Sequence, residues 1–193
     1  DARAQDELED EMNAAFGTRT VNSAGTEDAF VARVDPNGTV EWVTRAGGSA
    51  HEDVYALAVG PDHEAVLTGR FGTTASFGSS SLTSAGQMDA YVARLSAAGA
   101  WLWAVRIGGT ASDFGFDVSL GPSGDAFAIG SYTGAATAGS FALSAAGNDD
   151  VFVAKVTAAG AFSWAARAGG VGTDYGFGIG ADSVGGAVVT GRF

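Results

Sequence analysis

Apolar residues between positions 49 and 109 gather into four short runs that are separated by turn residues. The runs cover residues 54–59, 65–68, 90–95 and 101–105. A Gly-Pro-Asp-His segment at 60–63 separates the first two runs, and a Ser-Ala-Ala-Gly segment at 96–99 separates the last two. Such turns between apolar runs predict two β-hairpins. The Gly/Ser/Thr-rich stretch 72–88 is expected to connect them.

The same pattern recurs along the chain with a period of 61 residues. Segments 49–109 and 110–170 share 23 identical residues in 61 positions without a gap. The recurring residues include Trp42, Trp103 and Trp164; Arg45, Arg106 and Arg167; and Asp28, Asp89 and Asp150. Self-similarity at a fixed period is the signature of a duplicated structural unit. We therefore expect repeated supersecondary structure, in which these residues have structural roles.

Four antiparallel strands in every 61 residues, joined by Gly-rich segments, are typical of propeller blades. We predict an all-β fold: a β-propeller built from four-stranded antiparallel blades, with three 61-residue repeats in the chain. We place the run 54–59 and its counterparts innermost, since small residues suit the crowded centre of a propeller. The strand that carries the repeated tryptophan is then outermost.

The repeat also divides the chain into segments. Residues 1–12 do not match the repeat and are predicted to form an acidic leader, either a short helix or a disordered segment. The remainder divides into an outer half-blade 13–48, blades 49–109 and 110–170, and an inner half-blade 171–193. One blade is therefore expected to be composite, with its two hairpins supplied by segments 13–48 and 171–193.

One repeat contains Gly108 and Gly109, Asp89, the Val-Ala-Arg segment at 92–94, Gly99 and Trp103. With these residues and their counterparts, the chain resembles the bacterial β-propeller repeat family over roughly residues 13–193. The resemblance implies a surface or secreted bacterial propeller, and hence an extracellular or cell-surface location. It implies no enzymatic activity and carries no catalytic residue over to this chain.

The chain is strongly acidic, with 22 Asp and Glu against 10 Lys and Arg and a formal net charge of −12. This charge opposes binding to phosphate backbones and anionic membrane surfaces, so no nucleic acid partner is expected. No apolar run approaches the roughly 18–20 residues of a membrane helix, and no membrane insertion is predicted. The absence of cysteine excludes disulfides and thiolate metal sites.

Motifs that carry chemistry are scarce, and neither a nucleophilic triad nor a phosphate-binding loop is recognisable. We therefore predict no enzyme activity, no catalytic residue, no metal site and no cofactor. One carboxylate nevertheless recurs after each Gly-Gly pair, at Glu52, Asp113 and Asp174. A ring of such acids could bind Ca²⁺ or a cationic ligand through oxygen. Capping of backbone amides, or pairing with the repeated arginines, is the structural alternative that we favour.

Tryptophan occurs at repeated and at singular positions. The three repeated residues are expected to pack in the core or between blades, because they recur at one strand position. Trp101 is not matched by tryptophan in the other repeats. It shares a strand face with Trp103, so packing is the main expectation. Stacking against a sugar is the alternative that makes Trp101 a candidate binding residue.

Repeated polar positions without a catalytic motif favour a noncatalytic interaction or scaffold module that presents its loop faces to a protein or a glycan. The alternative is a Ca²⁺-dependent binding domain, or an enzyme, that uses the acidic ring. Three blades are fewer than the roughly four to eight blades of a typical closed propeller. We expect a homodimer that completes a six-bladed propeller, or a companion chain that supplies further blades.

Overall fold

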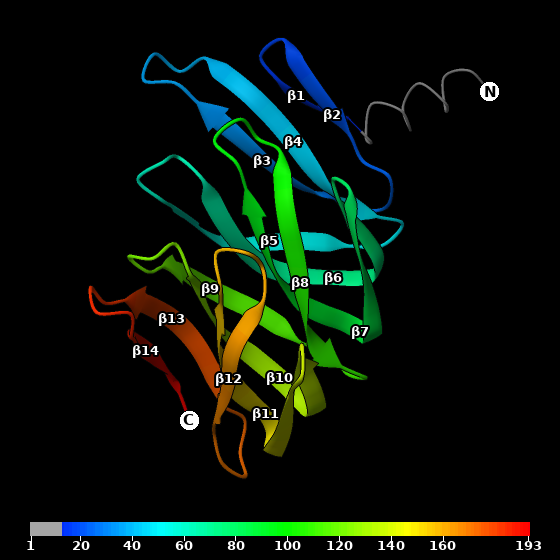
Figure 1. Cartoon of the computed structure of the whole chain (residues 1–193). Coiled ribbons are helices and arrows are strands. Elements are labelled where there is room, and N and C mark those ends of the chain that lie inside the picture. The colour runs from blue at the N-terminus through cyan, green and yellow to red at the C-terminus, as the bar shows by residue number, and fades with distance from the viewer. Residues whose placement is uncertain (1–12) are drawn as a thin grey trace, which may run out of the picture.

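The computed structural model describes residues 13–193, and this range contains 14 strands and no helix (Figure 1). The all-β class predicted from the sequence is confirmed. No helix long and apolar enough to span a membrane occurs in this part of the chain. The predicted leader, residues 1–12, lies outside the described residues.

Residues 49–109 form a four-stranded antiparallel sheet, which we call the first complete unit. Its strands are β5 (Glu52–Val59), β6 (Ala65–Phe77), β7 (Ser80–Leu95) and β8 (Trp101–Gly109). They pair in the order β5-β6-β7-β8, and each strand is antiparallel to its neighbours. The turn between β7 and β8 ends at Gly99, whose φ of 78° favours glycine. Both hairpins therefore lie where the apolar runs and turns predict them.

Residues 110–170 form an equivalent sheet, the second complete unit. Its strands are β9 (Phe114–Leu120), β10 (Ala126–Ala138), β11 (Phe141–Val156) and β12 (Phe162–Ala168). Their pairing order is β9-β10-β11-β12. The register is also the same, since Ala65 lies opposite Leu95 in the first unit and Ala126 lies opposite Val156 in the second.

Three further hairpins contain only parts of this arrangement. Their strands are β1 (Asn13–Phe16) with β2 (Arg19–Asn22), β3 (Ala29–Val34) with β4 (Val40–Gly48), and β13 (Tyr175–Ala181) with β14 (Ala187–Arg192). By sequence period, β3–β4 matches the third and fourth strands of a unit, and β13–β14 matches the first and second. The β3–β4 and β13–β14 hairpins lie at opposite ends of the molecule (Figure 1).

The stretch 72–88 differs from the connection that was predicted. Most of it is paired strand, because β6 continues to Phe77 and β7 begins at Ser80, directly opposite. Gly78, with a φ of 61°, lies in the tight turn between them. Small polar residues gave this stretch the composition of a loop, but backbone hydrogen bonding needs no apolar side chain. We call the extended hairpin, residues 74–83, and its equivalent 135–144 the arms.

The ends of β4 and β8 each pair with the arm of the following unit. Gly47 and Gly48 lie opposite Ser76 and Ala75, and Gly108 and Gly109 lie opposite Thr137 and Ala136. A Cβ at Gly109 would lie 1.9 Å from the carbonyl oxygen of Ala135, so a larger residue cannot enter without moving the backbone. This join makes the β3–β4 hairpin and the two complete units one hydrogen-bonded sheet of ten strands.

The apolar core lies largely between successive units. Val118 of β9 packs in one cluster with Val66 and Val92 of the first unit, and all three are buried. Alanines fill much of the same cluster, which lets the sheets approach closely. Ile179 of β13 packs in the same way against Phe127 of the second unit. Each unit is therefore stabilised mainly by its neighbours.

The repeated tryptophans also connect consecutive units. The indole N–H of Trp42 donates to the carbonyl oxygen of Ala97, and that of Trp103 donates to Ala158, both at 3.0 Å. Trp164 packs, partly buried, against the core of the second unit. These rings thus lie between repeats. A buried tryptophan usually needs a hydrogen-bond partner for its indole N–H, and Trp42 and Trp103 both have one.

Gly109→Ala should lower the free energy of unfolding by about 1–3 kcal/mol, because the added methyl group collides with a carbonyl oxygen at the join. Chemical denaturation followed by tryptophan fluorescence measures this change. Gly180→Ala is the control, because nothing lies within 4 Å of a Cβ added there and the equivalent positions hold Ala58 and Ser119. Its effect should stay within ~0.5 kcal/mol. Equal effects at both positions would contradict the proposed role of the join.

Candidate functional site

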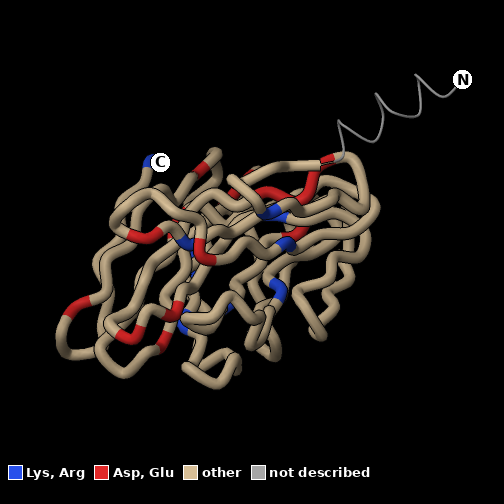
Figure 2. The backbone as a smooth tube through the Cα atoms, turned by 90° about the horizontal axis from the view of Figure 1, so that it is seen from above, with Lys and Arg blue, Asp and Glu red and all other residues tan. Residues whose placement is uncertain are grey.

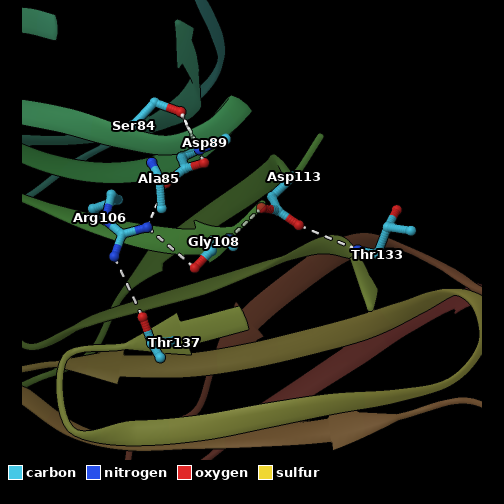
Figure 3. A network of polar contacts seen from close by, with 10 residues as sticks. Ser84, Ala85, Asp89, Arg106, Gly108, Asp113, Thr133 and Thr137 are labelled. Atoms are coloured by element: carbon cyan, nitrogen blue, oxygen red, sulfur yellow. Dashed lines mark hydrogen bonds and ion pairs between the residues drawn. The ribbon is translucent and has the colours of Figure 1, made fainter. Parts of the chain in front are cut away.

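A buried aspartate–arginine pair lies near the join of the first complete unit (Figure 3). Asp89 is fully buried in β7, and Arg106 of β8 donates from Nη1 to its Oδ2 at 2.5 Å. The same Oδ2 accepts the backbone N–H of Ala85, and Oδ1 accepts the hydroxyl of Ser84, both at 3.0 Å. A buried carboxylate is stable only with such compensation. The pair therefore holds the end of the arm against β8.

A second carboxylate lies on the other side of the glycine pair. Asp113 is fully buried, and its Oδ2 accepts the N–H of Gly109 at 2.7 Å while Oδ1 accepts that of Thr133 at 3.2 Å. A Cβ at Gly108 would lie 2.6 Å from Asp113 Oδ2 and 2.7 Å from Asp89 Cγ. Only the hydrogen atoms of Gly108 therefore separate two buried carboxyl groups.

This arrangement recurs in the other repeats. Arg45 donates to Asp28 at 2.5 Å and Arg167 donates to Asp150 at 2.8 Å. Glu52 and Asp174 accept the N–H groups of Gly48 and Gly170, both at 2.7 Å. The recurrent acid after each Gly-Gly pair thus caps a backbone amide, and the repeated arginine pairs with the other repeated acid. Of the two structural roles considered from the sequence, the geometry matches capping.

Burial raises the pKa of Glu52 and of Asp113. Desolvation raises the pKa of Glu52 to about 7, and the neighbouring Asp28 carboxylate contributes to this shift. Desolvation also raises the pKa of Asp113 to about 6, although its amide hydrogen bonds oppose the shift. Asp28 Oδ1 and Glu52 Oε1 are buried and have no hydrogen-bond partner among the described residues. A proton on Glu52 supplies a donor that this carboxyl pair otherwise lacks.

The acids do not converge on a common point. Within residues 13–193, no group of three or more His, Cys, Asp or Glu side chains is placed to hold a metal ion. Ca²⁺ typically takes about 6–8 oxygen ligands, and the capping acids already accept hydrogen bonds from backbone amides. The arrangement is therefore suited to capping amides and holding a proton. The Ca²⁺ site considered from the sequence remains a prediction.

Trp101 lies between the β3–β4 hairpin and the first complete unit. Its Nε1–H donates to the carbonyl oxygen of Arg45 at 3.0 Å. Its ring meets that of Phe77 edge-on, with 5.2 Å between the ring centroids. The polar and apolar parts of the side chain thus both have internal partners, as a packing residue requires. The sugar-stacking role considered for it remains a prediction.

Aromatic side chains on three neighbouring strands form a cluster that was not predicted from the sequence. Phe116 of β9 lies at its centre, with ring centroids 5.8 Å from Phe114, 5.9 Å from Tyr55 and from Phe177, and 6.2 Å from Tyr175. Such separations are typical of attractive aromatic pairs. Tyr55 and Phe177 are exposed, so the cluster presents an apolar surface to solvent.

Two arginines complete this surface. Their guanidinium groups lie over four rings: Arg70 at 5.1 Å from Phe114 and 5.8 Å from Tyr55, and Arg192 at 4.6 Å from Tyr175 and 5.9 Å from Phe177. These are cation–π distances. Arg70 also donates to Asp53 at 2.7 Å, which fixes its orientation. We call these five aromatic residues and two arginines the aromatic–arginine cluster.

A β-bulge places one aromatic residue of each repeat in this cluster. The strand register skips Tyr55 in β5, Phe116 in β9 and Phe177 in β13. A bulged residue leaves the regular ladder, and its side chain is redirected. The three positions are 61 residues apart, so the period could have revealed them. They were not predicted, because the innermost position of this strand was inferred from its small residues and its aromatic residues were given no role.

Most basic side chains are matched locally with acids. Lys and Arg positions are scattered among Asp and Glu positions along the backbone (Figure 2). Ion pairs to carboxylates are formed by Arg33, Arg45, Arg70, Arg94, Arg106, Lys155 and Arg167. The basic residues thus stabilise the fold locally through ion pairs.

Comparison with known proteins adds no family assignment. No protein-family model matches the chain, and no curated protein matches it either. The resemblance to the bacterial β-propeller repeat family therefore rests on the motif residues alone.

Glu52→Gln tests the proton on the first capping acid. The folded state raises the pKa of Glu52 from 4.5 to about 7. Its contribution to stability is therefore fully present below pH 4.5 and is lost as the pH rises through about 7. Glutamine keeps an acceptor and a donor at every pH, so the variant should lose this part of the pH dependence. Denaturation midpoints across that range measure it, with exposed Glu41→Gln as the control. Unchanged profiles in both variants would contradict the protonated acid.

Proposed function

We propose that the chain forms consecutive blades of a β-propeller that acts as a noncatalytic interaction module. The observation that carries the proposal is the exposed aromatic–arginine cluster, with its rings on β5, β9 and β13 and its arginines on β6 and β14. The proposed setting is extracellular or at a cell surface, which is the location that the family resemblance implies.

The contacts between units support a propeller arrangement. Each complete unit has the four antiparallel strands of a blade, and successive units pack face against face. In this arrangement β5, β9 and β13 are innermost. Asp117 Oδ2 and Ser119 Oγ of β9 accept the N–H groups of Ile179 and Ala181 of β13, at 2.8 and 3.0 Å. Side chains of one inner strand thus reach the backbone of the next, as at a crowded propeller centre.

The chemistry of the cluster favours a protein ligand. Aromatic residues and arginine contribute most of the binding free energy at many protein interfaces, whereas lysine and glutamate are depleted there. The cluster contains rings and guanidinium groups, and hydroxyls of Tyr55 and Tyr175 are oriented by hydrogen bonds to Asp53 and Asp149. Rigid rings with oriented polar tips can bind an extended segment of another protein at low entropic cost.

The buried acids support a noncatalytic role. Each capping acid is buried and accepts an amide hydrogen bond. The unpartnered oxygens of Asp28 and Glu52 are the observation that keeps the Ca²⁺-dependent alternative as a second candidate.

Ca²⁺ titration separates these two candidates. If the acids are structural, millimolar Ca²⁺ should leave the melting temperature unchanged, because it binds the folded state no better than the unfolded state. Differential scanning calorimetry measures this, with Mg²⁺ as the control for ionic strength. A rise in the melting temperature that Asp28→Asn with Glu52→Gln abolishes would support the Ca²⁺-dependent alternative.

Ligand selection tests the interaction module. The chain is screened against a displayed random-peptide library and a glycan array, and the selected ligands are measured by calorimetry. We expect peptide ligands whose affinity falls at least about tenfold in Tyr55→Ala with Phe177→Ala, the loss that about 1.4 kcal/mol produces. Leu102→Ala, an exposed apolar residue on β8, is the control and should bind normally. Glycan ligands, or peptides that bind the double variant equally well, would contradict the proposal.

A further inference from the structure

Two strands, β3 and β14, each lack a neighbour that the equivalent strands of the complete units have. In the sheet, β3 is hydrogen-bonded only to β4, and β14 is hydrogen-bonded only to β13. Both are largely apolar: β3 is Ala-Phe-Val-Ala-Arg-Val and β14 is Ala-Val-Val-Thr-Gly-Arg. Unpaired apolar edges of this kind are templates for another strand.

The junction that these edges lack is present twice inside the chain. By sequence period, β14 is equivalent to β6 and β10, while β3 is equivalent to β7 and β11. In the complete units, β6 pairs with β7 and β10 pairs with β11 in one common register. The same register, carried to the next repeat, places Ala187 opposite Val34. The molecule thus contains two formed junctions, β6–β7 and β10–β11. It also contains the two strands of a third junction, β14 and β3, in separate hairpins.

Side-chain exposure at β14 shows the lack of this partner. Val188 is 70% exposed, whereas the equivalent Val66 and Phe127 of the complete units are fully buried. Val189 is exposed in the same way. A mainly apolar cleft of about 660 Å³ borders the strand and is lined by residues that include Ile129, Val151, Tyr175, Val189 and Phe193.

The strand β3 has the matching deficiency. Phe30 is 52% exposed, whereas the equivalent Tyr91 and Phe152 are fully buried. Val34, at the other end of the strand, is exposed as well. The exposed side chains of β3 and β14 thus lie at positions that are buried in the complete units, where the neighbouring strands and units are present.

The first complete unit also has an uncovered face next to β3. Leu57 of β5 is 54% exposed, whereas the equivalent Val118 of β9 is buried against the preceding unit. An apolar cleft of about 210 Å³ separates this face from β3 and is lined by residues that include Val31, Val34, Trp42, Leu57, Val59 and Ala65. At the equivalent position of β13, Ile179 is covered by Phe127 of the inner hairpin β9–β10. The hairpin β13–β14 is equivalent to β9–β10, so it is the element that would cover Leu57.

We infer that β14 of one chain pairs with β3 of a second copy, and that β14 of the second copy pairs with β3 of the first. The inference rests on the proposed propeller and names its partner. Each composite unit would contain β13–β14 from one copy and β3–β4 from the other, giving a closed ring of six units. Two-fold pairing of this kind leaves neither edge of either copy unpaired.

The chemistry of the two edges is compatible with this pairing. Across β6 and β7, Thr68 Oγ1 donates to the carbonyl oxygen of Tyr91 at 2.7 Å. Thr190 occupies the position of Thr68, and Phe30 occupies that of Tyr91, so the same hydrogen bond would form between copies. Neither β3 nor β14 contains an acidic residue, so the charge of −12 on each chain does not oppose contact at this edge.

Pairing would also complete the aromatic–arginine cluster. Phe116 has ring centroids 5.9 Å from Tyr55 on one side and 5.9 Å from Phe177 on the other. In the closed ring, Phe177 of one copy would stand beside Tyr55 of the second copy in the same way. The bulged aromatics of both copies would then surround one common centre, and the cluster in a single chain is only half of the site.

Light scattering of the 193-residue chain is the first test. The expected mass is twice the 19.2 kDa of one chain and should not change over the micromolar concentration range. A mass of one chain would overturn the inference. Larger open assemblies would also overturn it, because they would mean that the edges pair without closing a two-fold ring.

Disulfide trapping tests the register, because the chain contains no native cysteine. Val189 lies opposite Ala32 in the inferred register, so Val189→Cys with Ala32→Cys should form a covalent dimer under mild oxidation. Val189→Cys with Val31→Cys is the control, since a shift of one residue directs the two thiols to opposite faces. Equal cross-linking of both variants, or none in either folded variant, would overturn the pairing.

These measurements are independent of the ligand test. A cross-linked dimer that binds no peptide would sink the interaction module and leave the strand pairing intact. A monomer that binds peptide through Tyr55 and Phe177 would overturn the pairing and leave the module intact.

Discussion

The close backbone approach at the glycine join is the constraint on which the rest of the structure depends. At Gly48 and Gly109 the last strand of one unit meets the arm of the next with no room for a side chain. The amide of each glycine is satisfied by a buried acid, Glu52 or Asp113. The join sets the distance between units, and that distance decides which side chains meet in the core and at the inner strands.

The join also explains why acids are buried in pairs. One acid of each pair, such as Asp89, binds an arginine, and the other, such as Asp113, accepts the glycine amide. Two carboxylates separated by a glycine repel each other in a medium of low dielectric constant. The balance is reached by raising the pKa of the capping acid, as at Glu52 and Asp113. These acids therefore serve the fold.

Stability in such an array is shared between neighbours. A unit of a repeat protein buries its faces mainly against adjacent units, so its stability is close to a sum of local and nearest-neighbour terms. The complete units show the result, because Val66 and Phe127 are buried at positions where Val188 is exposed. The same residue pattern is thus core in one place and surface in another, depending only on whether the next hairpin is present.

The sequence by itself determined the period, the two hairpins per repeat and their pairing order, because turn residues and apolar runs are local signals. It also pointed to the repeated Asp, Arg, Gly and Trp positions, which have one geometry in every repeat where their partners are present. Only the tertiary structure decided that 72–88 is an arm, because polar strands held by backbone hydrogen bonds have the composition of loops. It alone brought Tyr55, Phe116 and Phe177 together, because their meeting depends on a bulge in each inner strand and on the spacing that the glycine joins impose between units.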